Sequence, residues 1–497
     1  MTFGSLPFLF VFLPAALAAF YLASRRMPAV AVALLPIVSA LYCYLTDLRT
    51  LVLLGGSIAG NFLLLNLIRR SRAIPWMPGA LTAGGVVANL LPLVHYKLEH
   101  AASLGIMSQV GQGGVALQPI PLGLAFFTLQ QITFLVDAQR DDVPNLGFGR
   151  YCAWASLFCQ LPAGPIAPYG KMVPQFARLG AARPSVHDLA LGLSLFIFGL
   201  QKKLLLADFI GFTIDPLYRA AEIGPIHVYE GAAAIWGFMM QLYFNFSAYS
   251  DMAIGLGMCL GLRLPPNFDS PLQAKSVGGY IMRWHMSLMH FIRDYVFISL
   301  FRRLSGLRRH ITPMGVWAAA TVGSYVAMGA WHSLSGIFLA FSAFAGLVVV
   351  LAQLVHSLRK SRRGETSQPW ARRTMAILGQ LSVLIIASTT AMLLRAESLD
   401  GVRNILVSLG NFGDRLPAAV SLPKLIMVMT AASLVALACP NTMRLFGIID
   451  TGPATDAPWW KWRPSPYWGW AVGACGVIVL LLLTRDNSYQ DFLYARF

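Results

Sequence analysis

Two histidines stand at the edges of apolar stretches, where imidazole could carry proton chemistry. His285 ends the triplet Arg283-Trp284-His285, and His332 directly follows Trp331. Ionisable side chains near a bilayer interior are costly, so they point by default to chemistry or transport. Imidazole is also the side chain whose ordinary pKa suits proton exchange near neutrality. The two positions therefore predict a reaction site inside a membrane scaffold.

The composition predicts the scaffold. Hydrophobic residues make up 57% of the 497 positions and charged residues only 12%, whereas soluble domains carry about 25% charged residues. We expect an all-α, polytopic integral membrane protein with a single domain over residues 1–497 and about 11–13 spanning or re-entrant helices enclosing a tunnel. The apolar runs lie near 5–23, 27–45, 50–68, 75–94, 119–136, 148–167, 188–205, 230–262, 313–331, 334–356, 374–394, 424–439 and 467–484.

The net charge of +17 has a topological explanation. Its arginines and lysines cluster in short loops beside apolar runs, which is the positive-inside pattern and suits contact with anionic lipid headgroups. We therefore expect membrane lipids and no nucleic acid as partners. The six cysteines form no CxxC pair, so neither a disulfide framework nor a metal site is predicted. The first apolar run reads as a retained helix.

Two basic clusters place His332 relative to the membrane. The clusters at 302–309 and 359–373 both read as cytoplasmic, so the two apolar runs between them form a hairpin that turns at His332. Residues 313–331 would span roughly 28 Å as a helix. We expect His332 to lie away from the cytoplasmic surface. The polar and aromatic stretch 263–310, which contains His285, is expected to pack at the cytoplasmic side.

Each singled-out residue also has a purely structural explanation. His332 and Trp331 would suit a membrane interface, and Arg283 and Trp284 could seat a re-entrant segment at headgroup level. Asn245 and Asp251, within an apolar run, either fix helix packing through a buried network or line a polar cavity.

Other polar positions in the apolar runs allow similar expectations. Asp251 needs a partner such as an arginine. Lys202 and Lys203 with Asp208 are expected to mark the cytoplasmic end of a helix by snorkelling. The sequence Pro162-Ala163-Gly164-Pro165 interrupts a helix and predicts protein or cavity surroundings. There is no HExxH, GxSxG or Walker motif, so these residues alone indicate a polytopic membrane enzyme or a transporter.

As a set, these motifs resemble the membrane-bound O-acyltransferase family, in the bacterial branch that holds the alginate O-acetyltransferase membrane subunit. The similarity extends over most of the chain. Its most specific part is the Arg283–Leu288 sequence followed by Arg293-Asp294-Tyr295. The other matching stretches are 3–10, 121–128, 163–166, 243–256, 262–271 and 395–399.

The chain departs from the family pattern at three places. The family usually has Gly-Leu-Trp-His-Gly where this chain has Gly329-Ala330-Trp331-His332-Ser333. It also favours Asp at the position of Asn245, and a Tyr-Arg pair at the position of Gln139-Arg140. The histidine is kept, so the chemistry is expected to be intact.

The resemblance implies an acyltransferase with no bound cofactor that takes acetyl groups from acetyl-CoA at the cytoplasmic face of the bacterial inner membrane. The acceptor would be an extracytoplasmic polysaccharide, and a separate extracytoplasmic acetyltransferase would complete the transfer. His332 corresponds to the essential histidine, and His285 to a second catalytic position nearer the cytoplasm. Trp331, Arg283, Trp284, Asn245 and Asp251 are expected to contact substrate.

Three alternatives remain open at this stage. His332 could act as a general base or could itself accept the acyl group. D-alanyl transfer from a carrier protein competes with acetyl transfer from coenzyme A. A non-enzymatic transporter would use the same tunnel to move a small solute, although the absence of an internal repeat argues against inverted halves.

Overall fold

The computed structural model describes residues 1–110, 120–144, 147–179, 185–306, 312–334, 336–361, 368–395, 398–410, 412, 419–449, 458 and 460–484. These residues form helices joined by turns and irregular segments, and none of them forms a strand. The α-helices are α1 (Leu13–Arg26), α2 (Pro28–Thr46), α3 (Leu48–Arg70), α4 (Met77–Val110), α5 (Leu124–Arg140), α6 (Phe148–Ala155), α7 (Tyr169–Leu179), α8 (Val186–Lys202), α9 (Phe209–Ile223), α10 (Val228–Cys259), α11 (Val277–Ile281), α12 (Met286–Phe291), α13 (Ile298–Ser305), α14 (Pro313–His332), α15 (Gly336–Ser361), α16 (Pro369–Arg395), α17 (Leu399–Ser408), α18 (Leu422–Ala438), α19 (Thr442–Leu445) and α20 (Pro466–Leu483).

The predicted all-α, polytopic membrane fold is confirmed. Within the described residues, eight helices are long and apolar enough to cross a bilayer. They lie at Phe8–Arg26, Pro28–Thr46, Leu48–Ala73, Met77–Glu99, Val186–Ile223, Phe338–Val355, Pro369–Arg395 and Pro466–Leu483. The apolar runs of α5, α10 and α14 also form helices but are not among these eight. This accounts for part of the gap to the expected 11–13 elements.

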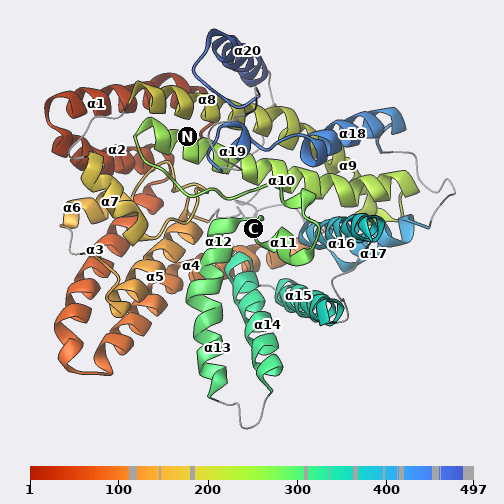
Figure 1. Ribbon diagram of the computed structural model, residues 1–497, viewed down its shortest axis with the longest axis horizontal. Helices are drawn as coiled ribbons and strands as arrows, with labels where there is room; N and C mark the ends of the chain where they lie inside the picture. Colours follow the sequence, from red (N-terminus) through yellow and green to blue (C-terminus); the bar gives the residue numbers. More distant parts are fainter. Residues whose placement is uncertain are drawn as a thin grey trace.

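Helix α10 is the centre of the fold. It runs through the middle of the molecule (Figure 1) and contacts α8, α9, α16, α17 and α18. Its closest neighbour is α8, because Gly192 and Gly255 face each other: a Cβ at Gly192 would lie 2.5 Å from the Gly255 carbonyl oxygen. In a membrane, where lipid is as apolar as the protein, such small residues permit the close packing that holds helices together.

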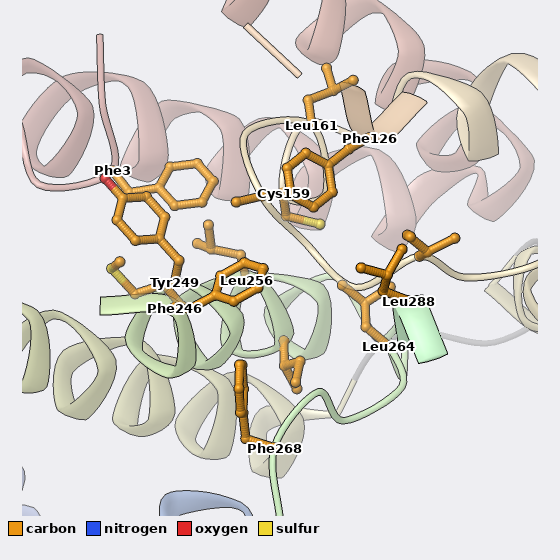
Figure 2. Packing of buried hydrophobic residues seen from close by; sticks show 14 of the residues in the cluster. Phe3, Phe126, Cys159, Leu161, Phe246, Tyr249, Leu256, Leu264, Phe268 and Leu288 are labelled. Carbon is orange, nitrogen blue, oxygen red and sulfur yellow. The ribbon is translucent and has the colours of Figure 1, made fainter. Parts of the chain in front are cut away.

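The segment after α6 departs from the predicted spanning helix at 148–167. Helix α6 ends at Ala155, and residues 156–168 form turns and irregular backbone. Pro162, Gly164 and Pro165 explain the interruption, because proline and glycine disfavour a continuing helix. The segment is buried, as predicted for interrupted backbone at membrane depth. Figure 2 shows its Cys159 and Leu161 near Phe126, with Phe246 and Tyr249 of α10 in the same buried cluster.

The predicted hairpin at His332 is confirmed. Helix α14 ends at His332, and α15, which begins at Gly336, packs along it. On its other side α14 contacts α13 and the π-helix η5 (Ile292–Phe297), which continue α12 (Figure 1). Residues 308–309, 362–367 and 396–397, which include parts of the basic clusters and of the 395–399 match, lie outside the described residues.

The position of His285 nearer the cytoplasmic side of the membrane than His332 stays a prediction, and the structure describes how both histidines lie relative to one arginine pair. An unbroken helical run from Met286 to Ser305 packs beside α14 and carries Arg302 and Arg303 in its last turn. His285 comes just before the first residue of that run, and Arg302 and Arg303 lie at its other end. His332 is the last residue of α14, so each histidine lies a full helix length from the arginine pair.

Candidate active site

One cavity of about 190 Å³ brings the two predicted histidines together. Helices α10, α11, α12, α14, α15 and α16 all contribute side chains to its wall. The lining consists of aromatic and aliphatic residues with few polar groups: Leu242, Phe246, Tyr280, Ile281, Trp284, His285, Leu288, Met289, Tyr325, Met328, His332, Phe338, Phe341, Ser342, Ala345, Thr390 and Leu394. An apolar cavity with a few convergent polar groups is typical of a small-ligand site.

His332 is the last residue of α14. Its ring centroid lies 4.6 Å from that of Trp331 and 6.1 Å from that of Phe338 on α15. The ammonium group of Lys97 on α4 donates a hydrogen bond to the His332 carbonyl oxygen at 2.5 Å. The carbonyls at a helix C-terminus have no partner within the helix, and a cation there is favourable. Lys97 therefore anchors the end of α14 at the cavity.

His285 is held in an unusual backbone conformation. It is the N-cap residue of α12, with φ 42° and ψ 54°, in the left-handed region. Only 3% of the residue is exposed, and the ring stands edge-on to Phe246 with a centroid distance of 4.5 Å. Neither ring nitrogen has a hydrogen-bond partner among the described residues. Buried polar atoms in proteins are nearly always paired with protein groups, water or a ligand, so these two nitrogens are candidates for contact with a molecule in the cavity.

Of the predicted substrate contacts, Trp284 lines the cavity and Arg283 does not. Trp284 stacks on Tyr280 with a centroid distance of 5.6 Å. The Arg283 carbonyl oxygen accepts a hydrogen bond from the Asp269 amide at 3.1 Å. Trp331 is buried beside the cavity, where its indole nitrogen donates to the Ala125 carbonyl at 3.0 Å.

Asn245 and Asp251 are buried in α10 away from the cavity lining. The Asp251 carboxylate accepts hydrogen bonds from the Lys202 ammonium and, at 2.5 Å, from the Thr442 hydroxyl. The expected partner of Asp251 is thus confirmed, and it is Lys202, which α8 brings against α10, rather than an arginine. Asp251 belongs to a buried packing network.

The prediction of snorkelling lysines is also wrong. Lys202 precedes the π-helix η3 (Lys203–Asp208), which joins α8 to α9 without a break. Lys203 is completely buried and pairs with Asp208 five residues later. A charge pair between near neighbours was not anticipated, because snorkelling assumes that the helix ends at the lysines.

Sequence reasoning missed Lys97 and the aromatic residues of α14 and α15 that line the cavity. The apolar run was taken to end at residue 94, whereas α4 continues through Lys97, which is 7% exposed. A lysine one turn beyond an apolar run was the available signal. Tyr325, Phe338 and Phe341 carry no signal that separates them from other apolar helix residues, because only the tertiary packing of α14 on α15 brings them to the cavity.

The close contact of α14 and α15 beside the cavity gives a first prediction. A Cβ at Gly329, one turn before His332, would collide with the Ser342 hydroxyl and lie 2.5 Å from the Ser342 Cβ. We expect Gly329→Ala to lower the free energy of unfolding by about 1–3 kcal/mol, as overpacking does. Thermal melting in detergent measures the change. The double variant Gly329→Ala/Ser342→Gly should recover most of the loss, and a double variant as unstable as the single one would contradict this packing.

Comparisons with known proteins agree on one family. The model of the membrane-bound O-acyltransferase family matches residues 127–389. The chain is 31% identical to the probable alginate O-acetylase of Pseudomonas aeruginosa over 70% of this chain and 67% of that protein. It is 34% identical to the peptidoglycan O-acetyltransferase of Helicobacter pylori over 36% of this chain and 39% of that protein. It is also 22% identical to the teichoic acid D-alanyltransferase of Bacillus subtilis over 59% of this chain and 73% of that protein. This multi-pass bacterial membrane protein is therefore an acyltransferase and belongs to the membrane-bound O-acyltransferase family.

Proposed function

We propose that the protein transfers acetyl groups from acetyl-CoA, supplied at the cytoplasmic face of the inner membrane, toward an extracytoplasmic polysaccharide. The observation that carries the proposal is the shared cavity of His285 and His332. The names of two relatives, an alginate O-acetylase and a peptidoglycan O-acetyltransferase, both specify acetyl transfer to a polysaccharide. Acetyl transfer is therefore the reaction that these two relatives support, although a third relative is named as a D-alanyltransferase.

The cavity chemistry favours acetyl over D-alanyl transfer. A D-alanyl group carries an ammonium, and burying a charge without a partner is costly. Among the described residues that line the cavity none is acidic, whereas the aromatic and aliphatic wall suits an uncharged methyl group. Aromatic faces attract a desolvated cation by about 2 kcal/mol, which is less than the cost of several kcal/mol for burying an ion without an opposite charge. We therefore assign the acetyl thioester as donor and treat the D-alanyl thioester as the competing donor in the test.

The reaction requires a base near the thioester carbonyl. The acceptor hydroxyl oxygen attacks the carbonyl carbon, a proton passes to the His332 imidazole, the C–S bond breaks, and the coenzyme A sulfur leaves and takes a proton. If His332 itself accepts the acetyl group, an acyl-imidazole forms first and the acceptor oxygen then displaces it. His285 lines the same cavity, and its ring nitrogens have no partner among the residues that the structure describes, so we assign it to hydrogen bonding of the donor or acceptor.

Substrate contact is proposed for Trp284, which lines the cavity. Trp331, Arg283, Asn245 and Asp251 do not line it, so we assign them no substrate contact there. A cavity of about 190 Å³ accommodates an acetyl group but not a polysaccharide strand. We therefore infer that an extracytoplasmic acetyltransferase partner receives the acetyl group and completes the transfer to polymer.

The donor assignment is tested in inverted inner-membrane vesicles that contain the full chain. We expect acetyl-CoA to release free coenzyme A thiol in the presence of the partner and polysaccharide, with labelled acetyl recovered on the polymer. A D-alanyl carrier-protein thioester added under the same conditions should not be consumed. Consumption of the D-alanyl thioester with no turnover of acetyl-CoA would contradict the assignment. Rapid acetylation of polymer by the chain without any partner would refute the inferred relay.

A further inference from the structure

The backbone on both sides of His285 is fixed by a second segment of the chain. Residues 267–269 lie beside 283–286, and two main-chain hydrogen bonds join them. The Asp269 amide donates to the Arg283 carbonyl at 3.1 Å, and the Met286 amide donates to the Asn267 carbonyl at 2.9 Å. The two bonds lie on either side of His285. They hold the residue in the left-handed region, which side chains with a Cβ adopt only when their surroundings impose it.

The Asn267 side chain adds two further bonds at the same place. Its carbonyl oxygen Oδ1 accepts from the Ser287 amide at 3.2 Å, and its Nδ2 donates to the Ser250 hydroxyl of α10 at 3.0 Å. Asn267 is fully buried. The first turn of α12 has amides without partners inside the helix, and Asn267 satisfies two of them, those of Met286 and Ser287. The residue thereby connects the start of α12 to α10.

An asparagine suits this position because one side chain must accept and donate at once. An amide provides an acceptor oxygen and a donor nitrogen on one planar group, and an ionised carboxylate provides acceptors only. A third element joins the same turn, since the Ser287 hydroxyl accepts from the Ile166 amide at 3.0 Å. No residue in the described part of the chain makes a hydrogen bond to a ring nitrogen of His285. The direction of its imidazole therefore depends on the backbone that Asn267 holds.

We propose that Asn267 is a positioning residue that aims the His285 imidazole into the cavity by fixing the turn that precedes α12. Asn267 does not line the cavity and acts only through His285. The proposal rests on the proposed function for its kinetic test. The placement of the His285 ring does not depend on the proposed function, because chemical labelling measures it without any enzymatic turnover.

The kinetic test compares Asn267→Ala with Asn61→Ala in membranes. Asn61 is 2% exposed and exchanges hydrogen bonds of 2.9 and 2.8 Å with Asn89, so it matches Asn267 in burial and bonding while lying on α3 away from the cavity. We expect Asn267→Ala to lower kcat about 10–100-fold with KM for acetyl-CoA changed less than about threefold, because a small misplacement of a reacting group costs rate. Asn61→Ala should leave kcat per folded protein unchanged. Equal kcat values for the two variants would overturn the proposal.

A second variant keeps the proposal testable if Asn267→Ala does not fold, and a second measurement keeps it testable if acetyl-CoA is not the donor. Ser250→Ala removes only the acceptor of Asn267 Nδ2 and should lower kcat with an unchanged KM, so full kcat in this variant would overturn the proposal even if Asn267→Ala does not fold. Labelling with diethyl pyrocarbonate, read at His285 by mass spectrometry, should be faster in Asn267→Ala or Ser250→Ala than in wild type or Asn61→Ala. Wild-type protein without acetyl-CoA turnover would contradict the proposed function, whereas unchanged labelling in the variants would contradict the positioning role.

Discussion

Replacing His332 with alanine is expected to lower the rate of acetyl transfer roughly 10²–10⁴-fold, which corresponds to about 3–5 kcal/mol of transition-state stabilisation. His332 lines the cavity at the end of α14, so the change removes the proposed base or acyl acceptor. Alanine has a high helix propensity and should leave α14 intact. The measurement is the initial rate of acetyl-CoA turnover in vesicles, normalised to the amount of folded protein.

A histidine away from the cavity provides the control. His187 is more than half exposed and lies beside Trp462. His187→Ala should retain the wild-type rate. Substantial turnover in a His332→Ala protein that is expressed and folded normally would remove His332 from the reaction.

The two proposed roles of His332 predict different states of its imidazole after exposure to acetyl-CoA when no acceptor is present. An acyl acceptor would carry one acetyl group on its imidazole after brief exposure to acetyl-CoA, detectable as a mass increase on the peptide that contains His332. A general base would carry none. The experiment therefore decides between two mechanisms that the position of His332 on the cavity wall allows equally.

The sequence predicts most of the helical scaffold, because apolar runs of spanning length have few other structures open to them in lipid. The hairpin of α14 and α15 follows from the apolar runs at 313–331 and 334–356 and the basic clusters beside them. The run at 148–167 illustrates the limit. Its composition is apolar enough for a span, but Pro162 and Pro165 interrupt it, and packing inside the protein replaces the lipid environment that hydropathy assumes.

Site residues can be predicted where an ionisable side chain interrupts an apolar run, and cannot be predicted where the residue is of the same type as its apolar neighbours. His285 and His332 stand out because imidazole is costly in an apolar surrounding. Phe338 and Thr390 reach the same cavity from α15 and α16 and resemble their neighbours in every local respect. Asn267 belongs to a motif that resemblance singled out, but only its hydrogen bonds to the turn after His285 reveal a role for it.

The second large effect is expected at the buried ion pair of Asp251 and Lys202. Asp251 is 2% exposed, and the Lys202 side chain is 13% exposed. Asp251→Ala would leave the Lys202 ammonium inside the protein without its carboxylate. Breaking a buried pair in this way costs about 3–5 kcal/mol, so we expect a large fall in thermal stability, measured by melting in detergent. The exposed pair of Arg263 and Asp188 is the control, since Arg263→Ala should cost no more than about 1 kcal/mol.

Removing both charges separates a packing role of this pair from a part in the reaction. The double variant Lys202→Met/Asp251→Leu leaves no uncompensated charge, and well-packed apolar residues often replace a buried ion pair with little loss of stability. The Thr442 hydroxyl, which contacts both side chains, would lose its partners and limit the recovery. Because Asp251 does not line the cavity, we expect the folded double variant to keep the wild-type rate of acetyl transfer. A stable double variant without activity would instead place the carboxylate in the reaction and would require a polar path from α8 to the cavity.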